Sequence, residues 1–403
     1  MIKKQKAFLI GLLAISLAAC GNKSTIEQPE DEIEKEIVKN EDVVKKDKEE
    51  KMDVVKYNEF ASESYSSIFK DYIKDSKEKN LIYSPYSYKM ALEGVGKVTN
   101  SFDKDSYLSE AVKENMSQNL SSVKTKNLVM LDKTTFDTKD KGISLVSFPD
   151  EAAKLSIDTQ KEVLGHVLSE PDYSTDTKFV SLNATKFESK WEVPFKITET
   201  DEFNTLDNTV SDKDFLYGEI DNIAYVDEDV EVGRKRLKED DSYVYFVNPK
   251  KSEKEDLQKV ASKISDYIGT FNRYMVQDSL IGMENIKDYD EVNISLPKID
   301  TESTIDILKA EVENGHSQLA DNFKYKDSIK SPLKDGSIDS IIQVANMKLD
   351  EEGVKAEAVT EIVTMTALAP EKEKDILNID CSHPHFVVCV SEGIMTFIGF
   401  VGY

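Results

Sequence analysis

The sequence predicts an α+β protein with large β-sheets. Hydrophobic residues make up 39% of its 403 residues, enough to bury a sizeable core. From about Tyr57 apolar side chains recur at helical spacing, whereas from Asn127 onward strand-like apolar runs alternate with polar turns. Helical patterns combined with many such runs, and no internal repeat, are typical of a mixed α+β domain.

The N-terminus is typical of a secreted protein. A lysine-rich start is followed by an apolar run too short to span a bilayer and by small residues before Cys20. The segment Leu17-Ala18-Ala19-Cys20 resembles the bacterial lipobox. That resemblance implies a signal peptide at residues 1–19, diacylation of the Cys20 thiol with chains such as palmitate, and a cell-membrane anchor on the extracytoplasmic side. An ordinary signal peptide that ends in cysteine is the alternative.

A charged tether follows the signal. Residues 20–56 are nearly all Glu, Lys, Asp and small polar residues after the cysteine, so they lack the apolar content to fold alone. We expect them to hold a single domain, residues 57–403, away from the membrane.

The domain begins with a helix, a short strand and a second helix. Apolar residues fall on one helical face in the first segment, and Leu81 to Tyr83 form a short strand. Ser84 is suited to cap the next helix, with Pro85 in its first turn. The apolar positions of the first helix are Ala61, Tyr65, Ile68, Phe69, Tyr72 and Ile73.

Seven later runs predict strands, and two segments predict helices. The helical segments are "KEVLGHVL" (161–168) and "STIDILKAEVENG" (303–315). The strand-like runs are "NLVML" (127–131), "KFVSLNATKF" (178–187), "YVYFVNP" (243–249), "VNISLP" (292–297), "IIQVANMKL" (341–349), "FVVCV" (386–390) and "MTFIGFVG" (395–402).

Charge and cysteine content disfavour several classes of function. The net charge of −25 would repel phosphates, so we expect no nucleic-acid partner. Three cysteines are too few for a disulfide framework. Cys381 and Cys389 with nearby histidines could be imagined as a zinc site, but their spacing is unusual and Cys389 lies in an apolar run. We therefore expect no metal and no cofactor.

An enzyme is also disfavoured. A hydrolase would need a nucleophile with a positioned base, and no Gly-x-Ser-x-Gly elbow is present. The chain has four histidines, His166, His316, His383 and His385.

The segment "EEGVKAEAVTEIVTMTALAP" (351–370) has a strand pattern within loop-like flanks. Every second residue from Val354 to Thr364 is uncharged, and most are small, whereas the interleaved set begins with Lys355, Glu357, Val359 and Glu361. One face is therefore fit for burial. The flanking Glu-Glu-Gly, Ala-Pro and "EKEKD" indicate an exposed loop.

Five segments in order resemble the serpin family, from about Tyr57 to Tyr403. They are "NLIYSPYSYKMAL", "SLNATKFESKWEVPFK", "VNISLPKIDTESTIDI", "LDEEGVKAEA" and "HFVVCVSEGIMTFIGFV". The resemblance implies the serpin fold, with large mixed and antiparallel sheets, about eight or nine helices and an exposed reactive loop. It assigns Ser84, Ser87, Asn183, Trp191 and Gln343 to the shutter and breach of the central sheet; Gln343 stands where the family often has histidine.

The resemblance also implies an inhibitor. A protease would attack the loop and form an acyl-enzyme, and the cleaved loop would insert into the central sheet and distort the protease. The uncharged face would then be buried, and we expect Gly353 to give the hinge backbone freedom. The implied hinge residues are Glu351, Glu352, Gly353, Val354, Ala356, Ala358 and Thr360.

The family's register places the reactive bond at Ala367-Leu368, with Met365-Thr366 and Leu368-Ala369 as neighbouring choices. A small alanine fits the shallow pocket of an elastase-like or subtilisin-like serine protease; a cysteine protease is the other target class. We expect a monomer. The alternative function is a non-inhibitory serpin-fold surface lipoprotein that acts as a binding protein.

Overall fold

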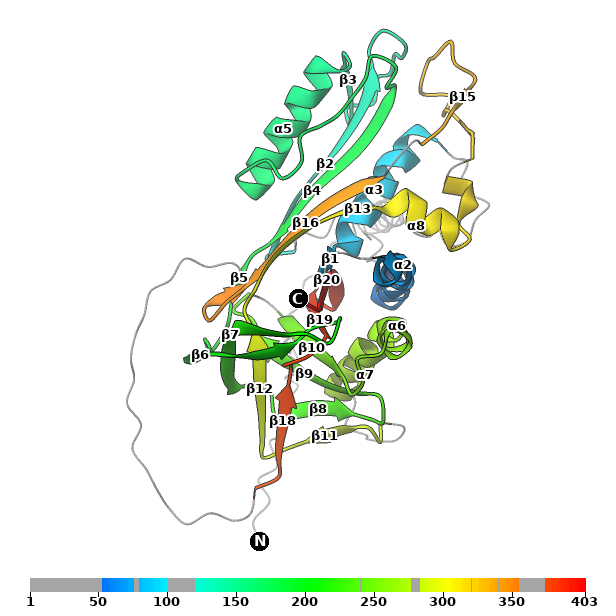
Figure 1. Cartoon of the computed structure of the whole chain (residues 1–403). Coiled ribbons are helices and arrows are strands. Elements are labelled where there is room, and N and C mark those ends of the chain that lie inside the picture. The colour runs from blue at the N-terminus through cyan, green and yellow to red at the C-terminus, as the bar shows by residue number, and fades with distance from the viewer. Residues whose placement is uncertain are drawn as a thin grey trace, which may run out of the picture. The chain divides into compact units, whose positions relative to one another are not determined.

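The computed structural model describes residues 53–75, 80–99, 120–239, 241–276, 283–319, 321–338, 341–354 and 374–403. A seven-stranded antiparallel sheet forms one centre of the fold (Figure 1). Its strand order is β1 (Leu81–Tyr83), β20 (Ile394–Val401), β19 (His385–Ser391), β10 (Ser242–Pro249), β9 (Val230–Arg236), β8 (Ile223–Val226) and β11 (Ile286–Asp288).

The central strands of this sheet are buried on both faces. In β10 the side chains of Tyr245 and Val247 pack into one hydrophobic cluster, and those of Val244 and Phe246 pack into another. Strands covered on both sides have continuous apolar sequences, as "YVYFVNP" and "FVVCV" have. The predicted strands at 243–249, 386–390 and 395–402 are therefore confirmed.

Helices pack into the first of these clusters. Their bounds are α2 (Val54–Asp75), α3 (Pro85–Val98), α6 (Lys254–Ala261) and α7 (Ile264–Val276). The Phe69 ring of α2 lies edge-on against Phe386 and Phe400 of the sheet, with centroid distances of 5.3 and 4.9 Å. The helix predicted from Tyr57 onward is therefore confirmed, and its apolar face covers the sheet. Among the described residues, no helix is both long enough and apolar enough to span a membrane.

The second cluster lies between the seven-stranded sheet and a four-stranded one. The order of the smaller sheet is β18 (Ile376–Asp380), β12 (Glu291–Pro297), β7 (Val210–Glu219) and β6 (Ile197–Asn204). β18 and β12 are parallel, and the other pairs are antiparallel.

Two further sheets lie next to the segment that begins at Gly353. One has the order β13 (Ile299–Asp306), β16 (Ile342–Leu349), β17 (Gly353–Val354) and β5 (Ser189–Lys190). The other has the order β3 (Ile143–Val146), β2 (Val123–Asp132) and β4 (Phe179–Phe187), and α5 (Asp150–Leu164) packs on β2 and β4. A small hairpin pairs β14 (Phe323–Lys324) with β15 (Asp335–Gly336).

Ser84 confirms the predicted start of α3. Its hydroxyl oxygen accepts a hydrogen bond from the Ser87 backbone N–H at 3.1 Å, and Pro85 occupies the first turn. This cap fixes the change from β1 to α3 within a single residue.

Two predicted helices are wrong at their boundaries. The segment predicted helical at 161–168 is helical only to Leu164, because Gly165 adopts a left-handed φ of 89° and ends α5. The segment predicted helical at 303–315 continues β13 as far as Asp306, in register with β16. The Asp306 carboxylate then accepts from the Lys309 N–H at 3.2 Å and starts α8 (Ile307–Glu313). A single 3₁₀ turn, η2 (Ser317–Leu319), follows.

Candidate functional site: the hinge and the sheet opening

A tight turn connects β16 to β17. The Asp350 carboxylate accepts from the backbone N–H groups of Glu352 and Gly353 at 3.0 and 3.3 Å, and the Asp350 N–H donates to the Gly353 carbonyl at 3.0 Å. This arrangement reverses the chain, so that Val354 pairs antiparallel with Leu349. We call residues 350–353 the hinge turn.

The loop after β5 holds the hinge turn from the other side. The Trp191 backbone N–H donates to the Glu352 carbonyl at 3.0 Å, and its indole Nε1–H donates to the Asp350 carbonyl at 2.9 Å. The Phe195 N–H donates to the Glu351 carbonyl at 3.0 Å. Three successive carbonyls of the turn are therefore satisfied by two aromatic residues of one loop.

Gly353 is required for close approach rather than for an unusual backbone angle. It does not adopt a left-handed φ. A Cβ at this position would lie 2.3 Å from the Ser189 carbonyl oxygen and 2.6 Å from Lys190 Cα, both backbone atoms. The structure thus gives a reason for Gly353 besides the backbone freedom expected from the sequence: glycine alone lets β17 lie this close to β5.

Val354 lies in the buried interior. It is 2% exposed and belongs to the same hydrophobic cluster as Trp191 and Leu349. It pairs antiparallel with Leu349 of β16 on one side and with Ser189 of β5 on the other. The start of the loop is thus already a strand between two strands.

An ion pair joins the hinge turn to β12 and β13. Lys298 stands in the connection between those strands, and its Nζ lies 2.8 Å from Glu351 Oε2. The Lys298 ammonium lowers the pKa of the Glu351 carboxyl below its usual value. The pair is partly exposed, so its contribution to stability is modest.

Beyond the hinge turn, β4 and β16 run side by side (Figure 1) but belong to different sheets. β4 and β5 are consecutive segments of one extended stretch. This stretch pairs with β2 along β4 and with β17 along β5. Along the described lengths of β4 and β16, no backbone ladder joins them. Among the described residues, no strand is paired between β4 and β16 where β17 would continue; we call this stretch the sheet opening.

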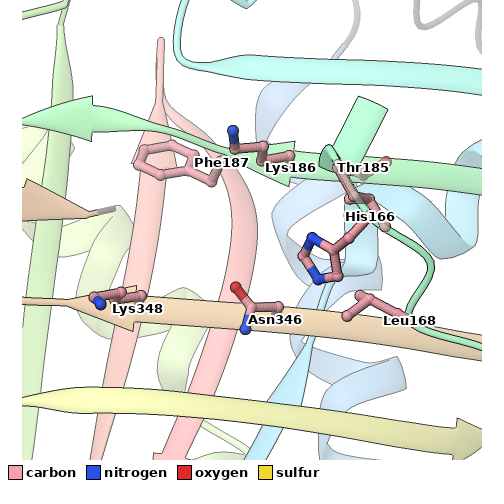
Figure 2. Close-up of a pocket in the computed structure, with 8 residues that line it drawn as sticks. His166, Leu168, Thr185, Lys186, Phe187, Asn346 and Lys348 are labelled. Carbon is pink, nitrogen blue, oxygen red and sulfur yellow. The ribbon is translucent and has the colours of Figure 1, made fainter. Parts of the chain in front are cut away.

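A pocket marks this opening. Its lining includes Thr185, Lys186 and Phe187 of β4, Asn346 and Lys348 of β16, and residues after α5. Figure 2 shows His166 and Leu168 reaching between the two strands. His166 Nε2 also lies 3.9 Å from Glu302 Oε1 on β13, so the segment after α5 extends across the opening.

The predicted shutter residues are only partly brought together. The Ser84 N–H donates to Gln343 Oε1 at 2.7 Å, Gln343 Nε2 donates to the Ser84 carbonyl at 2.8 Å, and the Ser84 hydroxyl donates to the Thr396 carbonyl at 2.8 Å. Asn183 lies apart from this group: its amide donates to Thr125 Oγ1 of β2 at 3.1 Å. Trp191 is at the hinge turn, as described above.

Several predicted positions fall outside the described residues. They are Cys20, Ala356, Ala358, Thr360, Ala367 and Leu368. Conversely, sequence reasoning missed Asp350, Phe195 and Lys298 as partners of the hinge. All three stand inside the quoted motifs, and Asp350 directly precedes the Glu-Glu-Gly of the hinge, so each could have been singled out.

The side chains of Cys381, Cys389 and His385 are buried in the core. Cys381 and Cys389 are free thiols, fully buried, and burial raises the pKa of each; that of Cys389 rises to about 12. Burial also lowers the pKa of His385 to about 4. In the part of the chain that the structure describes, no group of three His, Cys, Asp or Glu side chains is arranged to hold a metal ion.

In this fold β17 pairs with β16 and β5 at the end of a stretch along which β4 and β16 are not joined. The sequence profile of the serpin (serine protease inhibitor) family matches residues 155–403, more than half of the chain. The chain therefore belongs to the serpin family. A comparison with curated proteins found no match.

Solved structures with the same fold are distant in sequence. Serpin48, a highly specific serpin of the insect Tenebrio molitor, is 21% identical with a TM-score of 0.65, covering 88% of this chain and 99% of its own. Tengpin, a thermophilic serpin in its native state, is 18% identical with a TM-score of 0.67, covering 87% and 95%. Thyroxine-binding globulin in complex with thyroxine is 15% identical with a TM-score of 0.65, covering 87% and 98%. At these identities the likeness establishes the fold alone.

Proposed function

We propose that this protein is a suicide-substrate inhibitor of serine proteases that traps its target as an acyl-enzyme by inserting the reactive loop. One observation carries the proposal. β17 is hydrogen-bonded on both sides, to β16 and β5, at the entrance to a stretch where β4 and β16 are not joined. A cleaved loop that continued β17 would add a central strand and satisfy both free edges.

The register supports this proposal. If the pairing of Val354 with Leu349 and Ser189 continues, Ala356 comes to lie between Met347 and Phe187. Both of these neighbours are buried, at 3% and 6% exposure. Directly opposed residues of antiparallel strands point to the same face.

The next uncharged position follows the same rule. Ala358 would lie between Ala345 and Thr185, which are 2% and 7% exposed. Glu357, on the other face, would lie between Asn346 and Lys186, which line the pocket beside His166. Small uncharged residues thus meet the buried face, and a carboxylate meets a lysine.

Ala367-Leu368 is the bond that we propose for cleavage, with an elastase-like or subtilisin-like enzyme as target, because a small side chain fits a shallow pocket. A trypsin-like enzyme needs a cation at that position to pair with its carboxylate. Mass spectrometry of the C-terminal fragment released from a trapped complex tests the assignment. A fragment beginning at Leu368 supports it; one beginning at Glu373 contradicts both register and target class.

The decisive experiment incubates the full chain with a panel of proteases and follows the products by denaturing gel electrophoresis. An inhibitor gives a complex that survives boiling in detergent. Cleavage without a complex for every enzyme of the panel would favour the alternative, a non-inhibitory binding protein. Turnover of substrate by the domain itself would identify an enzyme.

We also propose that Cys20 is lipidated and that the domain is displayed outside the cytoplasm on a membrane anchor. The lipobox-like segment and the charged tether support this location. Cys20→Ser should block processing or release the protein from the membrane fraction. Unchanged membrane association and gel mobility would contradict the proposal.

A further inference from the structure

Lys235 is a buried lysine next to the hinge. It lies on β9, is 6% exposed, and donates from Nζ to the Glu219 carbonyl of β7 at 2.8 Å. Its ammonium group also lies 4.6 Å from the centre of the Phe195 ring. A cation at this distance from an aromatic face is attracted to it, more strongly when water is excluded.

The Phe195 ring is enclosed by other groups as well. It lies edge-on to Trp191, with a centroid distance of 5.5 Å and an interplanar angle of 89°. Gly218 leaves room for it, since a Cβ there would come within 3.0 Å of the ring. Lys235 therefore contacts the ring that packs against the tryptophan of the hinge.

We propose that Lys235 is a positioning residue of the hinge: its ammonium group fixes the Phe195 ring against Trp191 and thereby the backbone groups that bind the hinge turn. Phe195 and Trp191 together supply the three N–H groups that bind Asp350, Glu351 and Glu352. A shift of the Phe195 ring would therefore displace the N–H groups of both Phe195 and Trp191 from the carbonyls of the hinge turn.

The contact depends on the charge of Lys235, which gives it a pH dependence. Burial lowers the pKa of this lysine to about 8, and the carboxylates of Asp221 and Glu219 oppose the shift. Other charged groups nearby have their own partners: Arg234 donates to Asp221 at 2.8 Å, Arg236 lies 3.9 Å from Glu192, and Lys298 pairs with Glu351. Above about pH 8 the amine is neutral, and its attraction to the ring is lost.

The chain contains a built-in probe, because Trp191 is its one tryptophan and is fully buried. Tryptophan-selective fluorescence of the full chain should show a transition with a midpoint at about pH 8. Lys235→Met should abolish the transition and give the alkaline emission throughout. Lys235→Arg keeps a cation at every pH and should give the neutral-pH emission throughout. Lys238→Met, at an exposed position after β9, is the matched control and should titrate as the wild type.

A wild-type emission that does not change between neutral pH and the alkaline limit of folding, or the same transition in Lys235→Met, would overturn the proposal. The wild-type arm decides this even if the methionine variant does not fold. The effect on trapping rests on the proposed function: the ratio of cleaved to trapped chain with a subtilisin-like protease should rise about fivefold in Lys235→Met at neutral pH, and Lys235→Arg should restore it. If the wild type traps no protease, the proposed function fails while the fluorescence result still judges Lys235.

Discussion

Substituting Gly353 by alanine tests the hinge most directly. The new Cβ would lie 2.3 Å from the Ser189 carbonyl oxygen and 2.6 Å from Lys190 Cα, and backbone atoms on both sides cannot turn away as a flexible side chain can. Keeping β17 in place against this overlap costs about 1–3 kcal/mol. The alternative is release of the hinge turn from the sheet.

The cost of release can be worked from the contacts. It removes three hydrogen bonds from Trp191 and Phe195, about 1 kcal/mol each, and exposes Val354, about 1.5 kcal/mol. Freeing four residues returns roughly 4 kcal/mol of conformational entropy. The net loss is therefore about 0.5 kcal/mol, less than the cost of strain, so the hinge turn should be released and the free energy of unfolding should fall by only about this amount.

Function should respond more strongly than stability. Because Gly353 and Val354 are the first pair of the strand that we propose to insert, Gly353→Ala should slow insertion and give mostly cleaved, untrapped product. Denaturant unfolding followed by Trp191 fluorescence measures the stability, and denaturing gels measure the trapped fraction. Gly269→Ala is the control, since the nearest atom to its Cβ is Arg273 Nη1 at 3.7 Å. A Gly353→Ala variant that traps protease as well as the wild type would refute the reasoning.

Three further outcomes are expected. Val354→Arg places a charge at a side chain that is 2% exposed, so the loop should be cleaved at a normal rate without trapping, and trapping at wild-type efficiency would show that the assigned face is wrong. The pKa of Glu351 is lowered in the fold, so its carboxylate stabilises the protein above the pKa of an unfolded glutamate, and this contribution is lost as the pH falls through the folded pKa. In unfolding experiments across pH, Glu351→Gln should therefore lose less stability on acidification than the wild type, by at most about 1 kcal/mol. Loop cleavage should raise the unfolding temperature sharply in scanning calorimetry, whereas equal melting of intact and cleaved chains would indicate a non-inhibitory member.

Local pattern was enough for the elements whose burial is uniform along the chain. The apolar runs of β10, β19 and β20 are readable because both faces of these strands are covered. β6, by contrast, is exposed at every position except Phe203, so "ITETDEFN" has no apolar alternation to indicate a strand. Its pairing with β7 is visible only in the tertiary structure.

For the hinge, too, some features could be predicted from the sequence and others could not. The uncharged alternation from Val354 onward, and the family to which the chain belongs, could be predicted from the sequence by itself, because period and motif order are properties of the linear chain. The reason for Gly353 could not, because the backbone that it approaches belongs to residues 189 and 190, more than 160 positions away. The place of Lys235 could not be predicted either. "GRKR" has the composition of an exposed basic segment, and only the packing of β9 beneath the Phe195 loop buries its lysine against an aromatic ring.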